Sequence, residues 1–251
     1  MNKLTAPFVF LIILMISSCA NQTEKNQFVA DIEQAHKKSD FLQQKAVLFD
    51  FDLSFGGKPR LKGQITVLTN SSKARIDLAD GNQIFVVNDT VFYSPELDSS
   101  KVRFDAFTWN YFMLFPYKLS DPGTKWSNPE SLALGDVLYQ TQQLSFQDGT
   151  GDAPDDWYII YPNPNTHLID VAAYIVTAHK DKAKAEENPH AIKYSNYDRI
   201  NGIPIATTWT FWEWSKASGI SNNIGNATLS NIQFVSVEES DFTWPDHYLP
   251  I

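Results

Sequence analysis

The chain has 251 residues but only one cysteine, Cys19, so it cannot form an internal disulfide. It also lacks the G-x-S-x-G nucleophile elbow, the P-loop and the G-x-G-x-x-G dinucleotide fingerprint. Its histidines stand apart, without the H-x-x-x-H or H-E-x-x-H spacing that holds zinc. These absences argue against an enzyme without excluding one, because catalytic groups can assemble from distant positions. We predict no metal, no cofactor and no catalytic residues.

Positive charge is also scarce, since 20 Lys and Arg residues are outnumbered by 29 Asp and Glu residues, for a net charge of -9. An acidic surface argues against nucleic acid and against anionic lipid surfaces, both of which favour basic patches. Aromatic residues, in contrast, are abundant, with 17 Phe, 10 Tyr and 7 Trp. A chain of this length and composition can form one β-rich domain with a large core.

The lone cysteine follows an apolar run. A lysine at position 3 precedes the apolar residues 6–16, and two serines come directly before Cys19. This is the layout of a secretory signal, and about 11 apolar residues are too few to span a bilayer core, which needs roughly 20. The segment Ile16-Ser17-Ser18-Cys19 resembles the lipobox of bacterial lipoproteins, whose cysteine is lipidated and becomes the first mature residue.

We therefore predict a lipoprotein signal peptide at 1–18, a lipidated N-terminus and polar tether at 19–27, and one domain over 28–251. Two other interpretations stay open: a plain signal peptide with an incidental cysteine, or a buried membrane anchor. No second transmembrane segment follows in the sequence.

The periodicity of apolar residues predicts two helices within a β-rich domain. Phe28, Ile32, Ala35 and Leu42 make one apolar stripe, which predicts a helix over 28–42 with His36 on or near its exposed polar side. Alternation with period two then begins, and turn residues recur between short strands, as in an antiparallel meander over 43–244.

Residues 102–119 break this alternation. Apolar side chains lie all round the segment, so a helix here would be buried on most sides. Phe104, Phe107, Tyr111 and Leu114 would share one face, and Pro116 would mark the end of the helix.

The stretch GQITVLTNSSKARIDLADGNQIFVVNDTVFYSPELDSSKV resembles the central part of the Lol-type (LolA/LolB-like) periplasmic lipoprotein carriers and receptors. The preceding helix, the F-x-F-x-L-x-F strand and the closing DFTWPDHY fit the same layout. The resemblance implies a β-rich α+β fold: a single half-open antiparallel β-barrel whose apolar concave face is covered by helices acting as a lid. The cavity would receive acyl chains, lipid or lipoprotein.

Two features of that family have no clear counterpart. The carriers have an arginine near the turn before the ARIDL strand that helps to latch the lid, whereas this chain has Asn70 and Ser71 there, with Arg60 and Arg75 displaced. We therefore transfer no latch to this sequence. The protruding apolar loop of the receptors is also missing from the pattern.

The candidate ligand site consists of aromatic and apolar residues from the strands and from the second helix. They are Phe49, Phe51, Phe85, Phe92, Phe107, Tyr111, Leu114, Trp209, Phe211, Trp212 and Trp214. Strand alternation sends Trp209 and Phe211 to one face and Trp212 and Trp214 to the other. Ordinary core packing is the alternative for each residue, because such rings bury roughly 150–250 Å².

One acidic loop, DGTGDAPDDW, carries Asp148, Asp152, Asp155 and Asp156. Carboxylates in a glycine-rich loop can ligate calcium, but the spacing does not match the EF-hand template, which favours a solvated loop.

The function predicted from these features is that of a non-enzymatic, lipid-anchored protein of a Gram-negative envelope. It would face the periplasm from the outer membrane and bind an apolar ligand in the half-barrel. Two alternatives stay open: an envelope hydrolase or carbohydrate-active lipoprotein, with two cavity carboxylates about 5–10 Å apart, and a structural envelope component without a ligand.

Overall fold

The computed structural model describes residues 26–178 and 180–251. The predicted signal peptide, Cys19 and the tether up to residue 25 lie outside the described residues.

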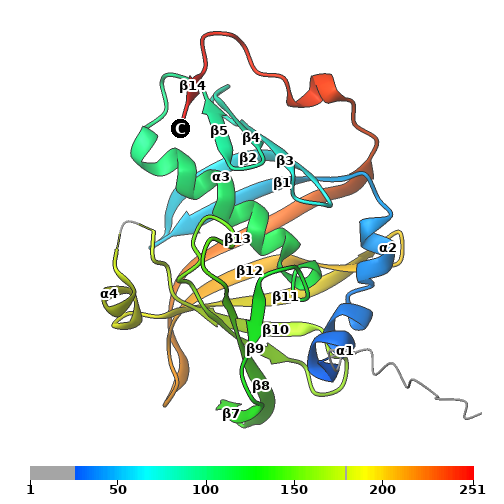
Figure 1. Cartoon of the computed structure of the whole chain (residues 1–251), viewed down its shortest axis with the longest axis vertical. Helices are drawn as coiled ribbons and strands as arrows, with labels where there is room; N and C mark the ends of the chain where they lie inside the picture. The colour runs from blue at the N-terminus through cyan, green and yellow to red at the C-terminus, as the bar shows by residue number, and fades with distance from the viewer. Residues whose placement is uncertain (1–25, 179) are drawn as a thin grey trace, which may run out of the picture.

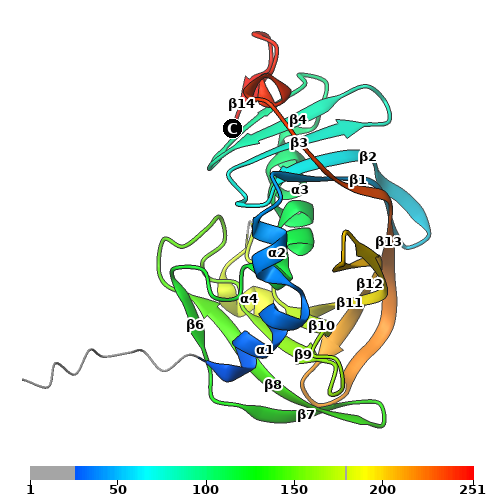
Figure 2. The same ribbon diagram turned by 90° about the vertical axis from the view of Figure 1, so that its right-hand side faces the viewer.

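A single antiparallel sheet organises the described chain. It has 14 strands in the order β14-β5-β4-β3-β2-β1-β13-β12-β11-β10-β9-β8-β6, with β7 paired to β8 off this path. The strands are β1 (Ala46–Phe55), β2 (Lys58–Leu68), β3 (Lys73–Leu78), β4 (Gln83–Val87), β5 (Thr90–Tyr93), β6 (Thr124–Trp126), β7 (Glu130–Leu134), β8 (Val137–Phe146), β9 (Tyr158–Pro162), β10 (Ile169–Tyr174), β11 (His190–Ile200), β12 (Ile203–Ser215), β13 (Gly219–Val235) and β14 (Leu249–Pro250). The sheet curves without closing, which confirms the predicted half-open barrel (Figure 2).

The period-two pattern of β1 shows why the sheet has an apolar concave face. Phe49, Phe51 and Leu53 point inward and are buried, whereas Asp50 and Asp52 alternate with them on the outer face. On the outer face Asp50 accepts hydrogen bonds from Gln64 and Asn231 of the neighbouring strands. A one-residue slip would put these carboxylates into the core, so the pattern fixes the register.

The helices are α1 (Gln27–Ala35), α2 (Lys38–Leu42), α3 (Ser99–Leu114) and α4 (Lys182–Glu186), with 3-10 turns η1 (Phe115–Tyr117) and η2 (Glu239–Phe242). The longest, α3, crosses the concave side of the sheet, and the sheet wraps around it (Figures 1 and 2). Within the described ranges, no helix is both long enough and apolar enough to cross a membrane.

The predicted helix over 28–42 is wrong in one respect, because it is two helices. Lys37 has φ 58° and breaks the helix in the left-handed region, as commonly happens at a helix C-terminus. The break turns the second half, so Phe41 is fully buried while Leu42, expected on the apolar stripe, is 46% exposed.

The second helix begins earlier and ends earlier than predicted. Asp98 caps α3 by accepting a hydrogen bond from the backbone N–H of Ser100. Pro116 lies in the 3-10 turn η1, which ends the helical segment at Tyr117. The face with Val102, Ala106, Trp109 and Met113 is the deeply buried one. Phe104, Phe107 and Tyr111, which were expected to define the main apolar face, are only partly buried.

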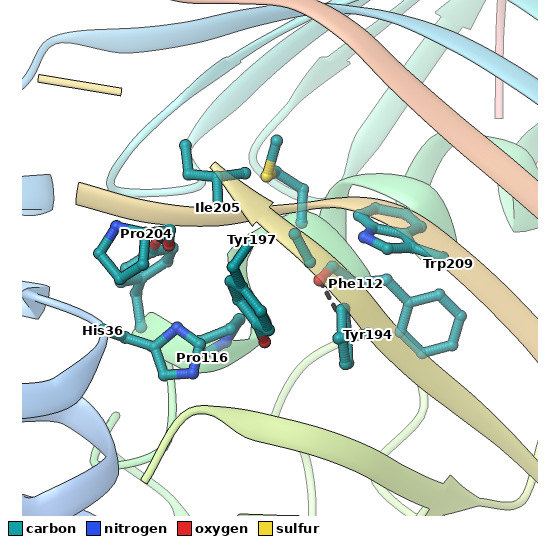
Figure 3. Close-up of a pocket in the computed structure, with 11 residues that line it drawn as sticks. His36, Phe112, Pro116, Tyr194, Tyr197, Pro204, Ile205 and Trp209 are labelled. Atoms are coloured by element: carbon teal, nitrogen blue, oxygen red, sulfur yellow. Dashed lines mark hydrogen bonds between the residues drawn. The ribbon is translucent and has the colours of Figure 1, made fainter. Parts of the chain in front are cut away.

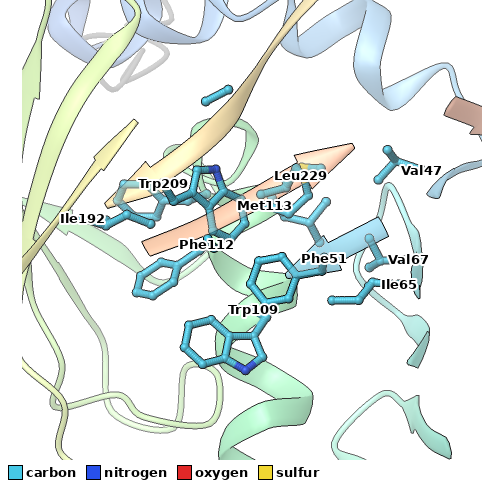
Figure 4. Close-up of a cluster of buried hydrophobic side chains, with 14 of the residues drawn as sticks. Val47, Phe51, Ile65, Val67, Trp109, Phe112, Met113, Ile192, Trp209 and Leu229 are labelled. Atoms are coloured by element: carbon cyan, nitrogen blue, oxygen red, sulfur yellow. The ribbon is translucent and has the colours of Figure 1, made fainter. Parts of the chain in front are cut away.

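Three apolar clusters hold the fold together. The main core lies between α3 and the concave face of the sheet (Figure 4). A second cluster lies between β7 and the outer face of strands β9 to β12. A third forms where Phe242 of η2 contacts Ala46 and Leu68. Only the first lies where the predicted ligand cavity should be.

Candidate functional site

The concave face beneath α3 is an aromatic surface. Phe51 of β1 lies 5.6 Å from Trp209 of β12 and 5.8 Å from Trp109 of α3, measured between ring centroids. Phe211 of β12 lies 6.0 Å from Trp109. These separations are in the range in which aromatic pairs attract each other beyond the burial of their area. Strands and helix therefore meet through rings (Figure 4).

Five of the predicted ligand residues lie in this core. Each has at most 1% of its surface exposed and belongs to the cluster beneath α3; they are Phe49, Phe51, Leu114, Trp209 and Phe211. Two more, Phe107 and Tyr111, pack against its edge from α3. The ring of Phe107 lies 4.9 Å from the guanidinium carbon of Arg103, and the ring of Tyr111 contacts those of Phe115 and Tyr158.

The expectation that Phe85 and Phe92 share this cavity wall is wrong. Strand alternation turns Ile84, Val86 and Val91 inward, and it places Phe85 and Phe92 on the outer face of β4 and β5. There the ring of Phe92 stacks on Trp244 at 3.6 Å, and Phe85 faces Trp244 and Tyr248 of the C-terminal segment. These rings anchor the C-terminus instead.

Trp212 and Trp214 also lie away from the concave face. The register of β12 against β13 shifts between Phe211 and Trp212 and again between Trp212 and Trp214. Trp214 is buried in the second cluster, where its Nε1 donates to the hydroxyl of Tyr161 at 3.2 Å. Trp212 is half-buried and donates to Thr210 Oγ1. Of the four aromatic residues in this stretch, Trp209 and Phe211 face the core beneath α3.

A partly buried ion pair ties α3 to the sheet. Nη2 of Arg60 on β2 donates to both carboxylate oxygens of Asp105 on α3, at 2.9 Å and 3.0 Å. Trp109 Nε1 donates to the same carboxylate at 3.0 Å. Burial raises the pKa of Asp105 above its ordinary value, while Arg60 and the bond from Trp109 act in the opposite direction. Desolvation is the larger effect, as is common for a buried ion pair.

A second polar residue of α3 is less well satisfied. Asn110 is buried, and its Nδ2 donates to the backbone carbonyl of Ala106 at 2.6 Å. Its Oδ1 has no hydrogen-bond partner among the described residues. A buried unpaired acceptor is unfavourable by about 1–3 kcal/mol, so it weakens the packed position of the helix.

The acidic loop after β8 holds the start of α3. Asp152 accepts from the guanidinium of Arg103, and Asp156 accepts from the backbone N–H and the hydroxyl of Thr177 at 2.8 Å each. In the part of the chain that the structure describes, no group of three or more His, Cys, Asp or Glu residues is placed to hold a metal ion. Two of the four carboxylates of the loop, those of Asp152 and Asp156, are thus used in protein contacts.

Little empty space remains beneath α3. A cavity of about 10 Å³ lies where α3 and η1 meet β11 and β12 (Figure 3). Its walls are formed by Phe112, Met113, Pro116, Tyr117, Tyr194, Tyr197, Pro204, Ile205, Ala206, Trp209 and His36. Pockets for small-molecule ligands measure about 300–1,000 Å³. In this structure, therefore, the concave face of the half-open barrel is filled by side chains.

Sequence reasoning missed three residues of this region: His36, Arg60 and Asp105. His36 was expected at the surface, but it is fully buried. His36 lies seven residues after Val29 and four after Ile32, the two buried residues of α1. This helical spacing places it on the apolar face, and it could have predicted that the histidine is buried. The pairing of Arg60 with Asp105 joins residues 45 positions apart and has no local signature.

A search among curated proteins finds no match to this sequence. Solved structures do match. A LolA superfamily protein from Nitrosomonas europaea is 12% identical, with a TM-score of 0.57 over 85% of this chain and 97% of that one. A domain described as an outer membrane lipoprotein-sorting protein, from Vibrio parahaemolyticus, is 10% identical, with a TM-score of 0.53 over 86% of this chain and 97% of its own.

These likenesses confirm the predicted Lol-type fold. The family model of a family of unknown function, DUF6503, matches residues 60–206, from Arg60 on β2 to Ala206 on β12. That range contains α3 and most of the strands that face it. The chain thus belongs to the DUF6503 family.

Proposed function

We propose that this protein binds an apolar ligand, such as the acyl chains of a lipid or lipoprotein, on the concave face of its sheet after α3 moves aside. The observation that carries the proposal is the position of α3 itself. It fills the concave face with Trp109, Phe112 and Met113, in the place where an acyl chain would lie against Phe51, Trp209 and Phe211.

The energetics of α3 suit a movable lid. Opening would expose apolar surface to water, which is unfavourable by about 25 cal/mol for each Å². An entering acyl chain would cover that surface again. The lid also includes a buried carboxylate with unfavourable desolvation, Asp105, and an unpaired buried oxygen on Asn110. Both make the closed position less stable than an all-apolar interface would be.

The chemistry of the concave face favours binding over hydrolysis. The main core cluster consists of aliphatic and aromatic residues. Asp105, the buried carboxylate that α3 contributes, is held by Arg60 and Trp109 rather than facing a second carboxylate. Two free carboxylates are what a glycosidase would need. We infer a non-enzymatic binding protein.

The same proposal places the protein in the envelope of a Gram-negative bacterium. A signal peptide at 1–18 and a lipidated Cys19 would anchor it, and the tether up to residue 27 would link the anchor to a single domain over 28–251. Facing the periplasm from the outer membrane, such a protein would meet lipid and lipoprotein as its natural apolar partners. The lipoprotein-sorting relative from Vibrio parahaemolyticus supports this choice of ligand.

Native mass spectrometry of the purified full chain tests the proposal. We expect a co-purified species with the mass of a lipid or acyl conjugate, released when the protein is denatured. A matched sample of a Trp209→Asp variant, with a carboxylate on the concave face, should carry less of it. A variant of the outer-face ring, Phe92→Ala, serves as control and should carry as much as the wild type. Protein that carries nothing, and takes up no added acyl lipid, would contradict the proposal.

A further inference from the structure

The cavity at the end of α3 is lined by a buried polar side chain, His36, that is only half satisfied by hydrogen bonds within the described residues. His36 follows α1 and points into the cavity, opposite Tyr197 and Pro204 (Figure 3). Its Nε2 accepts a hydrogen bond from the backbone N–H of Ile169 at 3.0 Å. A ring nitrogen that accepts carries no proton, so the proton of the neutral imidazole is on Nδ1.

Nδ1 is therefore a donor, and it has no acceptor among the described residues. The side chain is fully buried, so solvent does not reach it. Buried donors in native proteins are nearly always paired, so an unpaired one calls for an explanation, and a bound water or ligand is one such explanation. A volume of about 10 Å³ is enough for roughly one oxygen atom with the size of a water.

The hydroxyl protons of the neighbouring tyrosines are already engaged in hydrogen bonds. Tyr117, Tyr194 and Tyr197 all line the cavity, but each donates its hydroxyl proton to a backbone carbonyl: those of Pro204, Phe112 and Ile169, at 3.3, 3.0 and 2.7 Å. The Nδ1–H of His36, by contrast, is a fully buried donor that no hydrogen bond among the described residues engages.

The walls also determine which kind of acceptor can enter. They contain no Lys, Arg, Asp or Glu. Burial lowers the pKa of His36 to about 3, so the imidazole is uncharged at physiological pH and cannot balance a negative charge. A carboxylate would lose its hydration here without gaining a counter-ion, which is strongly unfavourable. A neutral carbonyl oxygen meets no such penalty.

We propose that this cavity receives the carbonyl oxygen of an acyl ester or amide, which accepts a hydrogen bond from His36 Nδ1–H. The acyl chain then runs along the concave face between α3 and Trp209, in the space that Phe112 and Met113 occupy in the closed state. This inference rests on the proposed function and adds a choice among its ligands. The site selects chains bound in esters or amides over free fatty acids and over bare hydrocarbon.

The test uses the full chain in amphipol and four brominated probes of equal chain length: an alkane, a methyl ester, an N-methyl amide and a free fatty acid. Bromine on the chain quenches tryptophan fluorescence, and Trp109 and Trp209 lie where the chain is expected. We expect the ester or the amide to bind about fivefold or more tightly than the alkane, the gain typical of one buried hydrogen bond. Both should also bind more tightly than the fatty acid. Whether the ester or the amide binds more tightly then shows whether the natural acyl chain is bound in an ester or in an amide.

Two substitutions separate the two nitrogens of His36. In His36→Gln the side-chain oxygen can replace Nε2 as the acceptor for Ile169, but no donor remains at Nδ1. In His36→Asn the amide N–H takes the place of Nδ1–H, and the acceptor for Ile169 is lost. We expect His36→Gln to bind ester and alkane equally, and His36→Asn to keep the preference for the ester. Should His36→Asn fail to fold, the comparison of the wild type with His36→Gln still shows whether the preference for the ester over the alkane depends on the Nδ1–H.

Equal binding of ester, amide and alkane by the wild type would overturn the inference alone, and the cavity would then hold only a water. Tightest binding of the fatty acid would overturn it as well, because the site would then accept a charge. If none of the four probes quenches the fluorescence, the proposed function fails, and the inference fails with it.

Discussion

Arg60 on β2 and Asp105 on α3 form an ion pair that ties the helix to the sheet, with Nη2 of Arg60 donating to both oxygens of Asp105 at 2.9 Å and 3.0 Å. Sequence comparison with the Lol-type pattern suggested no latch, because the expected position is occupied by Asn70 and Ser71. The structure has such a contact nevertheless. It comes from Arg60 near the start of β2, whereas Asn70 and Ser71 follow the end of that strand.

Removing Arg60 should loosen α3. In Arg60→Gln the buried carboxylate of Asp105 loses its cation. Breaking a fully buried pair is unfavourable by about 3–5 kcal/mol, and we expect about 1–2 kcal/mol here because the Arg60 side chain is 32% exposed. Hydrogen exchange of the amides of 99–114 should then be about tenfold faster. The control is Lys62→Gln, at a second position of β2. It breaks an exposed ion pair with Asp52 of β1 and should leave this exchange unchanged. Equal exchange in all three proteins would contradict a latch at Arg60.

Replacing Asp105 should have a different effect, visible in the dependence of stability on pH. Burial raises its folded-state pKa above the ordinary 3.8 despite the opposing attraction of Arg60. Its contribution to stability is therefore complete below that ordinary value and is lost as pH rises through the raised one. We expect urea unfolding to show the wild type losing stability relative to Asp105→Asn as pH rises from about 3 to 7. A wild type that gains relative stability over this range would mean that the attraction of Arg60 exceeds desolvation.

His36 should make the fold sensitive to acid. Burial lowers its pKa to about 3 from 6.5, so its contribution is complete above pH 6.5 and is lost as pH falls towards 3. One group of this kind removes about 1.4 kcal/mol of stability per pH unit in that window. His36→Gln, which can still accept from Ile169, should flatten the curve of unfolding free energy between pH 6 and 4. The exposed His247→Gln is the control and should follow the wild type. Parallel curves for wild type and His36→Gln would show that His36 does not titrate as proposed.

Lipidation at Cys19 stays a prediction from sequence, since that residue lies outside the described ranges. In cells fed with labelled palmitate, the wild type should take up label and fractionate with membranes. Cys19→Ala should lose the label and accumulate either unprocessed or in the soluble fraction. Ser18→Ala keeps a small residue before the cysteine and should behave as the wild type does. Label and membrane association that persist in Cys19→Ala would sink the lipoprotein interpretation.

The sequence was informative where local pattern determines structure. The alternation around Phe49 and Phe51 predicted the inward face of β1, and the apolar residues on all sides of 102–119 predicted a buried helix. Errors arose where the outcome depends on long-range packing. Phe85 and Phe92 read as cavity residues because nothing local shows that the C-terminal Trp244 covers the outer face of their strands.

The same limit applies to the polar parts of the candidate site. His36 contacts Ile169, 133 residues further along, and Arg60 on β2 contacts Asp105 on α3, with β3, β4 and β5 between them in the chain. Neither pair shares a local motif. Alternation did predict that Trp212 and Trp214 face away from Trp209, but it could not reveal that Trp214 is buried in a second cluster with Tyr161.

The most direct test of acyl binding beneath α3 is to locate the ligand by photo-crosslinking. An acyl ester with a diazirine near the end of its chain is bound to the full chain, irradiated, and the modified residues are mapped by mass spectrometry. We predict that adducts concentrate on residues that meet between α3 and the sheet, such as Phe51, Trp109 and Trp209, and that unlabelled ester competes them away. Adducts confined to outer-face residues such as Phe92 and Trp244, or adducts that unlabelled ester does not reduce, would contradict the account.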